Sequence, residues 1–122
     1  KFYLAGGSAD QKIIDEFIGK SECKNFFSLT GLSIKEIISI FKYADLYLGN
    51  DTGFMHISSA LGVKCIGLFI DSPAYAYSGY TKNIEAIVPR GETINSTTHN
   101  TNGRDKISSD EVIQKVLEHI AK

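Results

Sequence analysis

The sequence predicts an α/β fold in which a parallel β-sheet carries helices on both faces. Short apolar runs alternate with segments whose apolar residues recur at helical spacing, and the links between them are short. The run at residues 63–70 is almost continuously apolar, as expected of a strand covered on both faces. Strands joined in this order by helices pair in parallel through right-handed crossovers. The whole chain, residues 1–122, is therefore predicted to form one domain.

Composition narrows the classes of function. The 122 residues carry 13 basic and 14 acidic side chains, a net charge of −1 that favours neither nucleic acid nor anionic lipid. Cys23 and Cys65 have no metal-binding spacing, so we expect reduced, buried thiols in a cytosolic protein. No apolar run reaches the roughly 18 to 20 residues of a membrane span. The chain opens directly on a strand-like run, and we expect it to be a fragment of a larger protein.

The first predicted pair is a strand at residues 2–5 and a helix. A Gly-Gly pair ends the strand, and Ser8 begins a segment with capping-box spacing. Apolar residues then follow at helical period until Gly19 closes the helix: Ile13, Ile14, Phe17 and Ile18. Ser8 and Asp10 follow the carboxyl end of the strand, so each either caps the helix or meets a ligand hydroxyl.

The second pair is a strand at residues 26–29 and a helix that begins after a turn at residues 30–32. Ser33 and Glu36 have the spacing of another capping box. This helix has one apolar face, which we expect to pack on the sheet. The residues of that face are Ile34, Ile37, Ile38 and Phe41.

The remaining strands are predicted at residues 46–49, 63–70 and 84–88. A helix over residues 53–61 follows the first of them and stops at Gly62, a position suited to a left-handed cap. The carboxyl ends of the first four strands of the chain are expected to share one rim, where ligands of parallel sheets bind. The loops at that rim are residues 6–10, 30–33, 50–53 and 71–78.

Three later segments are predicted with less regular structure. Residues 71–80 form a Tyr-, Ser- and Gly-rich loop whose three tyrosines either pack on the surface or stack on a ligand ring. Residues 91–106 are polar and expected to be mobile. Ser108 and Glu111 cap a last helix, and His99 and His119 are expected to be exposed, with no partner evident in the sequence.

The stretch at residues 46–56 is the strongest candidate for a functional site. It combines a short strand, a polar turn with Asp51 and Thr52, and a helix that opens at Gly53. Free backbone N–H groups and the positive end of the helix dipole would face an anion there, and a glycine allows close approach. The alternative is a structural turn that binds nothing, with His56 as a structural residue.

Residues 49–62, Gly-Asn-Asp-Thr-Gly-Phe-Met-His-Ile-Ser-Ser-Ala-Leu-Gly, resemble the signature of the ADP-heptose:lipopolysaccharide heptosyltransferases, glycosyltransferase family 9. Residues 29–36 resemble the family's segment one helix upstream. Residues 4–10 resemble its Gly-Gly-x-x-Glu turn, and residues 78–83 its Pro-Tyr-Gly-x-Asn loop. The similarity runs over nearly the whole chain in the same order.

The resemblance implies a GT-B fold with two Rossmann-like domains, of which this chain would be most of the C-terminal, donor-binding one. The backbone at Thr52 and Gly53 would hold the donor phosphate, and Asp51 would lie near the sugar hydroxyls. His56 would sit close to the phosphates or brace the turn. Met55, another residue of the same motif, is also expected among the substrate-binding residues.

On the nucleoside side, the resemblance implies that Asp10 meets the adenosine ribose and that the backbone at Leu32 lies beside adenine. Ser8 is expected among the same substrate-binding residues. The residues after the fourth strand, 69–73, depart from the family's Gly-Pro-Thr-Asp-Pro, which leaves the loop contacts to the donor open.

The family's general base and acceptor site belong to an N-terminal domain, and its phosphate-binding Lys to a first β-α unit, both outside this chain. The missing strand would be central in a doubly wound sheet. We therefore expect the chain to be incompletely folded, oligomeric, or paired in a register different from that of the family.

The leading hypothesis is the ADP-sugar-binding part of a transferase that moves heptose, or a related sugar, to a lipopolysaccharide core. It implies an inverting, metal-free reaction, no cofactor, a cytoplasmic location with the parent peripheral on the inner membrane, and negligible activity of this chain alone. One alternative is a non-catalytic nucleotide- or phosphate-binding module, and a second is a structural α/β interaction domain. Preference for ADP-sugars, acceptance of many anions, or no binding would distinguish the three.

Overall fold

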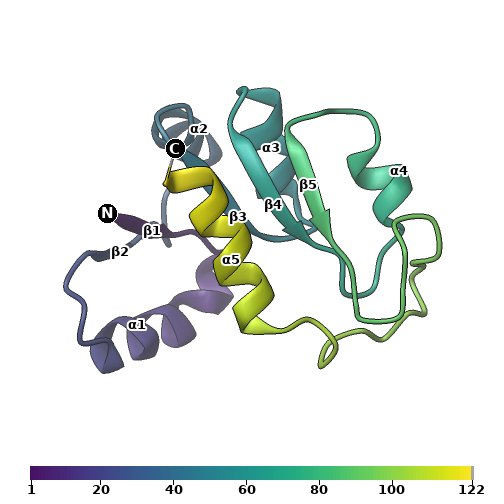
Figure 1. Ribbon diagram of the computed structural model, residues 1–122. Coiled ribbons are helices and arrows are strands. Elements are labelled where there is room, and N and C mark those ends of the chain that lie inside the picture. Colours follow the sequence, from purple (N-terminus) through teal and green to yellow (C-terminus); the bar gives the residue numbers. More distant parts are fainter. Residues whose placement is uncertain (122) are drawn as a thin grey trace. The chain divides into compact units, whose positions relative to one another are not determined.

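A computed structural model describes residues 1–121 of the chain, and its elements follow the predicted alternation of strands and helices (Figure 1). The elements in the described residues are β1 (Phe2–Leu4), the 3₁₀ helix η1 (Ser8–Asp10), α1 (Gln11–Lys20), β2 (Phe26–Ser28), α2 (Ile34–Phe41), β3 (Leu46–Asn50), α3 (Gly53–Ala60), β4 (Lys64–Leu68), α4 (Ala74–Ser78), β5 (Ile84–Ile87) and α5 (Ser109–Ile120).

All described strands pair in parallel, which confirms the α/β class, but they form two sheets instead of the expected one. β1 pairs with β2, and β3, β4 and β5 form a second sheet in that order. The expectation of one continuous sheet was therefore wrong. The strand that the family resemblance places at the centre of the sheet is not among these five.

The chain divides into two compact units, which are described separately. The first comprises Lys1–Ser39, and the second begins at Ile40. The assignment of the whole chain to a single domain remains a prediction. The candidate residues Ser8, Asp10 and Leu32 belong to the first unit, and the stretch around Asp51 belongs to the second.

In the first unit, aromatic rings join the two strands and α1. Phe2 and Phe26 are paired across the strands with ring centroids 5.0 Å apart, and Phe17 of α1 meets Phe26 edge-on at 5.1 Å. The capping box of α2 forms as predicted: the Ser33 N–H donates to Glu36 Oε2 at 2.7 Å, and the Glu36 N–H donates to Ser33 Oγ at 3.3 Å. The bond from the Ser33 N–H is the main cause that holds the pKa of the Glu36 carboxyl below its usual value.

Two helix boundaries of the first unit differ from the prediction. α1 continues through Gly19 to Lys20. Ser8 does not act as its cap; instead the Gly7 N–H donates to Asp10 Oδ2 at 2.9 Å, and residues 8–10 form a 3₁₀ turn before α1. The Asp side chain reaches back three residues to a free backbone donor, as acidic residues do in first turns.

In the second unit, helices cover both faces of the β3-β4-β5 sheet. Residues paired across parallel strands share a face, so Ile66 and Glu85 lie on one side, and Gly67 lies on the other. A Cβ at Gly67 would stand 2.6 Å from the Met55 sulfur, which places α3 on that side. Glu85 pairs with Lys115 of α5 at 2.7 Å, which places α5 on the opposite side, where it crosses β3 in Figure 1.

The core of the second unit lies under α3. It consists of Met55, Cys65, Phe69, Ala74 and Ile84, all buried; the central strand β4 supplies Cys65, and Phe69 follows that strand directly. Burial raises the pKa of the Cys65 thiol to about 11, so this thiol is neutral and structural at pH 7. Cys23 is exposed, so the expectation of two buried cysteines was wrong for this residue.

The segments predicted as loops in the second unit carry more structure than expected. Residues 74–78 form the short helix α4, and its first N–H donates to the buried hydroxyl of Thr97 at 2.9 Å. The Gly103 N–H donates to the Ile70 carbonyl at 2.9 Å, and the Arg90 N–H to that of Lys106 at 2.8 Å. The polar segment 91–106 is thus fastened to the end of the sheet by backbone bonds.

His119 has a partner that was not evident in the sequence. Its Nε2 lies 2.8 Å from Glu85 Oε2, and Lys115 pairs with the other oxygen of the same carboxylate. These two neighbours hold the pKa of Glu85 below its usual value. The sequence separation of 34 residues explains why no local pattern indicated the pair. Within residues 1–121, none of the helices is long and apolar enough to cross a membrane.

Candidate functional site

The polar turn after β3 is braced from within the sheet. Tyr47 and Gly49 point to the same face, and a Cβ at Gly49 would stand 2.5 Å from the Tyr47 hydroxyl. The missing side chain lets this hydroxyl lie along the strand and reach Thr52 Oγ1 at 3.3 Å. Burial is the main cause that raises the pKa of Tyr47, so the phenol stays neutral. The turn that carries Asp51 and Thr52 is therefore held by a half-buried side chain.

The N-terminus of α3 is open. Thr52 occupies the cap position with extended backbone, and in the described residues its side chain makes no capping bond. Its carbonyl accepts the N–H groups of Met55 at 3.1 Å and His56 at 3.4 Å. The N–H groups of Gly53 and Phe54 therefore have no partner inside the helix. The first turn itself carries no acidic residue, and the carboxylate nearest in sequence to the positive end of the helix dipole is Asp51, just before the cap.

Three side chains form a row beside this helix end. Asp51 Oδ1 lies 3.0 Å from His56 Nε2, and the Tyr80 hydroxyl lies 2.6 Å from His56 Nδ1. The Asp51 side chain is 15% exposed and the His56 side chain 36% exposed. The structure thus brings together two predicted site residues, Asp51 and His56, and adds Tyr80 to them.

Thr52 and Gly53 are exposed at the start of α3, where a ligand can reach them. A Cβ at Gly53 would have open space around it. Met55 is different, because its side chain is fully buried in the core and its N–H is used within the helix. Met55 anchors α3 against β4, and its side chain does not face the turn.

The candidate residues of the first unit follow the carboxyl ends of β1 and β2. Asp10 braces its own turn through the Gly7 N–H, and Ser8 is exposed beside it. Leu32 is exposed and follows Gly31, whose φ of +83° requires the left-handed conformation that glycine adopts most readily. Thr30 donates to the Gln11 side chain at 2.5 Å, which ties the two loops together.

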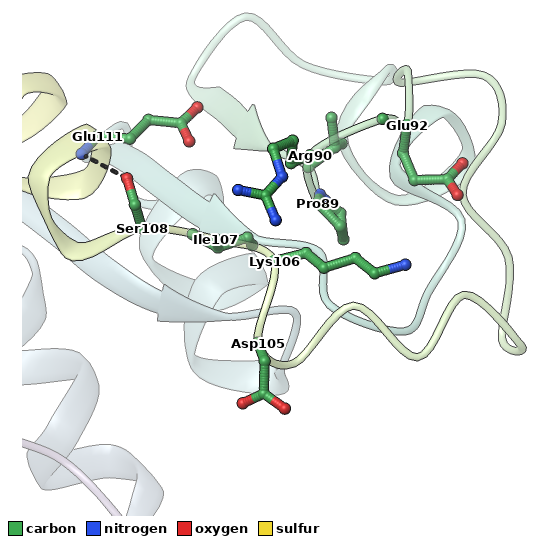
Figure 2. Close-up of a pocket in the computed structure, with 10 residues that line it drawn as sticks. Pro89, Arg90, Glu92, Asp105, Lys106, Ile107, Ser108 and Glu111 are labelled. Carbon is green, nitrogen blue, oxygen red and sulfur yellow. Dashed lines mark hydrogen bonds between the residues drawn. The ribbon is translucent and has the colours of Figure 1, made fainter.

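A surface hollow of about 410 Å³ lies between residues 88–92 and the start of α5 (Figure 2). Two basic and three acidic side chains line it: Arg90, Lys106, Glu92, Asp105 and Glu111. Ser108 Oγ accepts the Glu111 N–H at 3.2 Å and closes the helix end, as predicted. Asp105 and Lys106 point away from this first turn in Figure 2. The mixed charge and the capped helix give this hollow no preference for an anion.

Sequence reasoning missed the contribution of Tyr80 to the row. It left the loop tyrosines open between surface packing and ligand stacking. The structure places Tyr80 against His56, with ring centroids 5.9 Å apart and planes inclined by 29°. The two residues are 24 positions apart in different elements, so no local spacing could have indicated the contact. Tyr75 is exposed on α4, and Tyr77 on the same helix lies beside the His99 ring.

Comparison with known proteins identifies the family of the chain. The model of glycosyltransferase family 9 (heptosyltransferase) matches residues 1–106. Lipopolysaccharide heptosyltransferase 1 of Campylobacter coli is 36% identical over 67 residues, which cover 55% of this chain. The match spans 19% of the length of that relative. No solved structure matches the chain.

Proposed function

The chain belongs to glycosyltransferase family 9, and on that basis we propose that it is the ADP-sugar-binding part of a transferase. The parent enzyme would transfer heptose, or a related sugar, to a lipopolysaccharide core acceptor. The relative from Campylobacter coli is a lipopolysaccharide heptosyltransferase, which supports this choice of sugar and acceptor. The observation that carries the proposal is the open N-terminus of α3, directly after the acidic turn at Asp51.

The open helix end suits the leaving group of such a reaction. As the bond between the sugar and the phosphate oxygen breaks, the electron pair stays on that oxygen and the nucleoside diphosphate gains negative charge. The N–H groups of Gly53 and Phe54 offer fixed donors for this charge. A single oriented donor of this kind is typically worth about 3 kcal/mol of barrier. The proposal therefore needs no metal, and ADP-sugar is a substrate, with no separate cofactor.

The acidic side chain at the turn fits the sugar better than the phosphates, because two negative groups would repel each other. We assign Asp51 to the sugar hydroxyls, which a carboxylate can accept, and the Thr52 and Gly53 backbone to the donor phosphate. His56 supports Asp51 through the 3.0 Å contact. Met55 anchors the helix, and we propose no contact between its side chain and the substrate.

In the first unit, Asp10 is proposed for the ribose hydroxyls, with Ser8 beside it and the Leu32 backbone next to adenine. Asp10 is already oriented by the Gly7 N–H at 2.9 Å, which would lower the entropic cost of binding. The acceptor and the general base would come from the rest of the parent protein. A parent acting on a lipopolysaccharide core would work in the cytoplasm, peripheral to the inner membrane.

Titration of the isotope-labelled chain with ADP, using GDP and UDP as controls and backbone amides as the probe, tests the proposal. We expect shifts at residues 6–10, 31–33 and 51–56 with ADP alone. Equal shifts with all three nucleotides would favour a general phosphate-binding module. No shifts in a well-dispersed spectrum would favour a structural domain.

The Asp51→Asn variant separates the sugar from the nucleotide. It should bind ADP as the wild-type chain does and lose its preference for an ADP-sugar over ADP. Asp45→Asn, an equal change of charge at an exposed position, is the matched control. Loss of that preference in both variants would contradict the assignment of Asp51.

A further inference from the structure

We infer that Tyr80 is a positioning residue that holds the His56 ring in the tautomer and orientation in which it bonds Asp51, and that it thereby fixes Asp51 for the donor sugar. The inference rests on the proposed function for the identity of the ligand, and its geometry stands on the structure of the second unit alone. The three residues come from three places: the turn after β3, the first turns of α3, and the segment before β5.

The direction of the hydrogen bonds follows from what each group can donate. An ionised carboxylate only accepts, so the 3.0 Å contact between Asp51 Oδ1 and His56 Nε2 requires the proton on Nε2. In the neutral imidazole, Nδ1 is then an acceptor. The Tyr80 hydroxyl, 2.6 Å from Nδ1, supplies the matching donor. The row therefore runs from the Tyr80 O–H to His56 and from the His56 N–H to Asp51.

This direction is assigned from the hydrogen-bonding partners: Asp51, which only accepts, selects the Nε2–H form, and Tyr80 stabilises that form by donating to Nδ1. Water at Nδ1 accepts as readily as it donates, so without Tyr80 the preference for the Nε2–H form would rest on Asp51 alone. The phenol makes the Nε2–H form the one in which both contacts are satisfied. A second partner on the far nitrogen is the usual way in which a protein selects the tautomer of a functional histidine.

Tyr80 is held in place although the residue is 60% exposed. The Thr81 and Asn83 side chains, which follow it directly, bond to the C-terminal half of α3. Asn83 Nδ2 donates to the Ser59 carbonyl at 3.1 Å, and Ser59 Oγ donates to Thr81 Oγ1 at 3.5 Å. The Asn83 N–H donates to Thr81 Oγ1 at 3.1 Å. The segment is thus fastened to one end of α3 while the Tyr80 hydroxyl reaches His56 near the other.

The consequence for the ligand lies in the second carboxylate oxygen of Asp51. With Oδ1 engaged by His56, the carboxylate has a fixed plane, and in residues 1–121 no bond engages Oδ2. Oδ2 is therefore available to accept a sugar hydroxyl. An acceptor fixed before binding loses less side-chain entropy when the sugar arrives. Tyr80 would act on the sugar through two other residues and without touching the diphosphate.

The test is a measurement of the ring nitrogen shifts of His56 in the ¹⁵N-histidine-labelled chain at pH 8. We expect the wild-type chain to show the Nε2–H tautomer. In Tyr80→Phe, which keeps the ring and removes the hydroxyl, the shifts should move toward a mixture of both tautomers. Tyr77→Phe removes a hydroxyl from the same stretch of chain and should leave the His56 signals unchanged.

The same variants test the effect on binding. Tyr80→Phe should lower the preference for an ADP-sugar over ADP by about threefold to tenfold, the range of one hydrogen bond, while affinity for ADP itself is retained. A backbone amide spectrum like that of the wild type would show that the fold is intact.

The outcomes separate the inference from the proposed function. An Nδ1–H tautomer in the wild-type chain, or identical His56 shifts in Tyr80→Phe, would overturn the role of Tyr80 even if ADP binds. An unchanged preference for the ADP-sugar in a variant with altered tautomer would overturn the link to the sugar. A tautomer that depends on Tyr80 in a chain that binds no nucleotide would uphold the positioning role and contradict the proposed function.

Discussion

The N-termini of α3 and α5, two helices of the second unit, differ in whether side chains cap their first N–H groups. The first turn of α5 carries Asp110 and Glu111, and Ser108 caps it through the Glu111 N–H. In the described residues, the first turn of α3 has neither a side-chain cap nor an acidic residue. One helix satisfies its own end with side chains, whereas the other leaves donors and a positive dipole end for something else.

The difference is related to how each helix is held. α3 buries Met55, Ser58 and Ser59, so its body is anchored in the core. In the described residues α5 buries no side chain, and polar contacts such as those of Lys115 and His119 with Glu85 help to hold it. A helix anchored along its body can leave its end open for a ligand, whereas a helix docked at the surface depends more on its cap.

The largest expected effect is at the anchor of α3. Met55→Ala should lower the free energy of unfolding by about 2–5 kcal/mol, because it removes a fully buried side chain and leaves a cavity against Gly67. Val116→Ala, at a half-buried position of α5, is the matched truncation and should cost clearly less. Chemical denaturation of both variants measures the difference. Equal costs would contradict the contrast between the two helices.

The next effect concerns the open end itself. Gly53→Asp gives α3 the acidic first turn that α5 has, and it should weaken ADP binding about tenfold, equivalent to about 1.4 kcal/mol, since the carboxylate competes with the phosphates. Gly53→Ser adds a side chain without charge at the same open position and is the control. Titration of both variants with ADP makes the comparison. A similar loss in both would point to steric exclusion in place of charge.

The smallest effect concerns the cap of α5. Ser108→Ala removes the acceptor of the Glu111 N–H and should lower the free energy of unfolding by about 1 kcal/mol. Thr52→Ala, at the equivalent position of α3, removes no capping bond, only the longer 3.3 Å contact with the Tyr47 hydroxyl, and should cost less. Thermal or chemical unfolding of the two variants provides the measurement. A larger cost for Thr52→Ala would show that the α3 end is stabilised by its own side chain after all.

Most of the local structure could be predicted because its determinants are close in sequence. The Ser33–Glu36 and Ser108–Glu111 caps formed where their spacing indicated, and Gly62 adopts a φ of +83° after α3. The opening of α3 at Gly53 was confirmed for the same reason. Capping is a contact between residues three positions apart, so spacing located these two caps. The Ser8 spacing was the exception, because Asp10 bonds the Gly7 N–H there instead.

The errors concern contacts between distant residues or between strands. His119 had no partner evident in the sequence, yet it meets Glu85 from another element. The strands were expected in one sheet and form two, because an apolar run predicts a strand and does not show which neighbour that strand pairs with. Met55 follows the glycine of the central turn by two positions, but the turn of the helix directs its side chain into the core.

The sequence by itself determined the α/β alternation, the caps, the open polar turn before α3 and the family resemblance. These depend on residue type and short spacing, which the chain carries before it folds. Only the tertiary structure decided that Tyr47 braces the turn, that Tyr80 meets His56, and that α3 and α5 cover opposite faces of a sheet. Such contacts depend on the register of strands and the placement of loops, which arise when distant segments pack together.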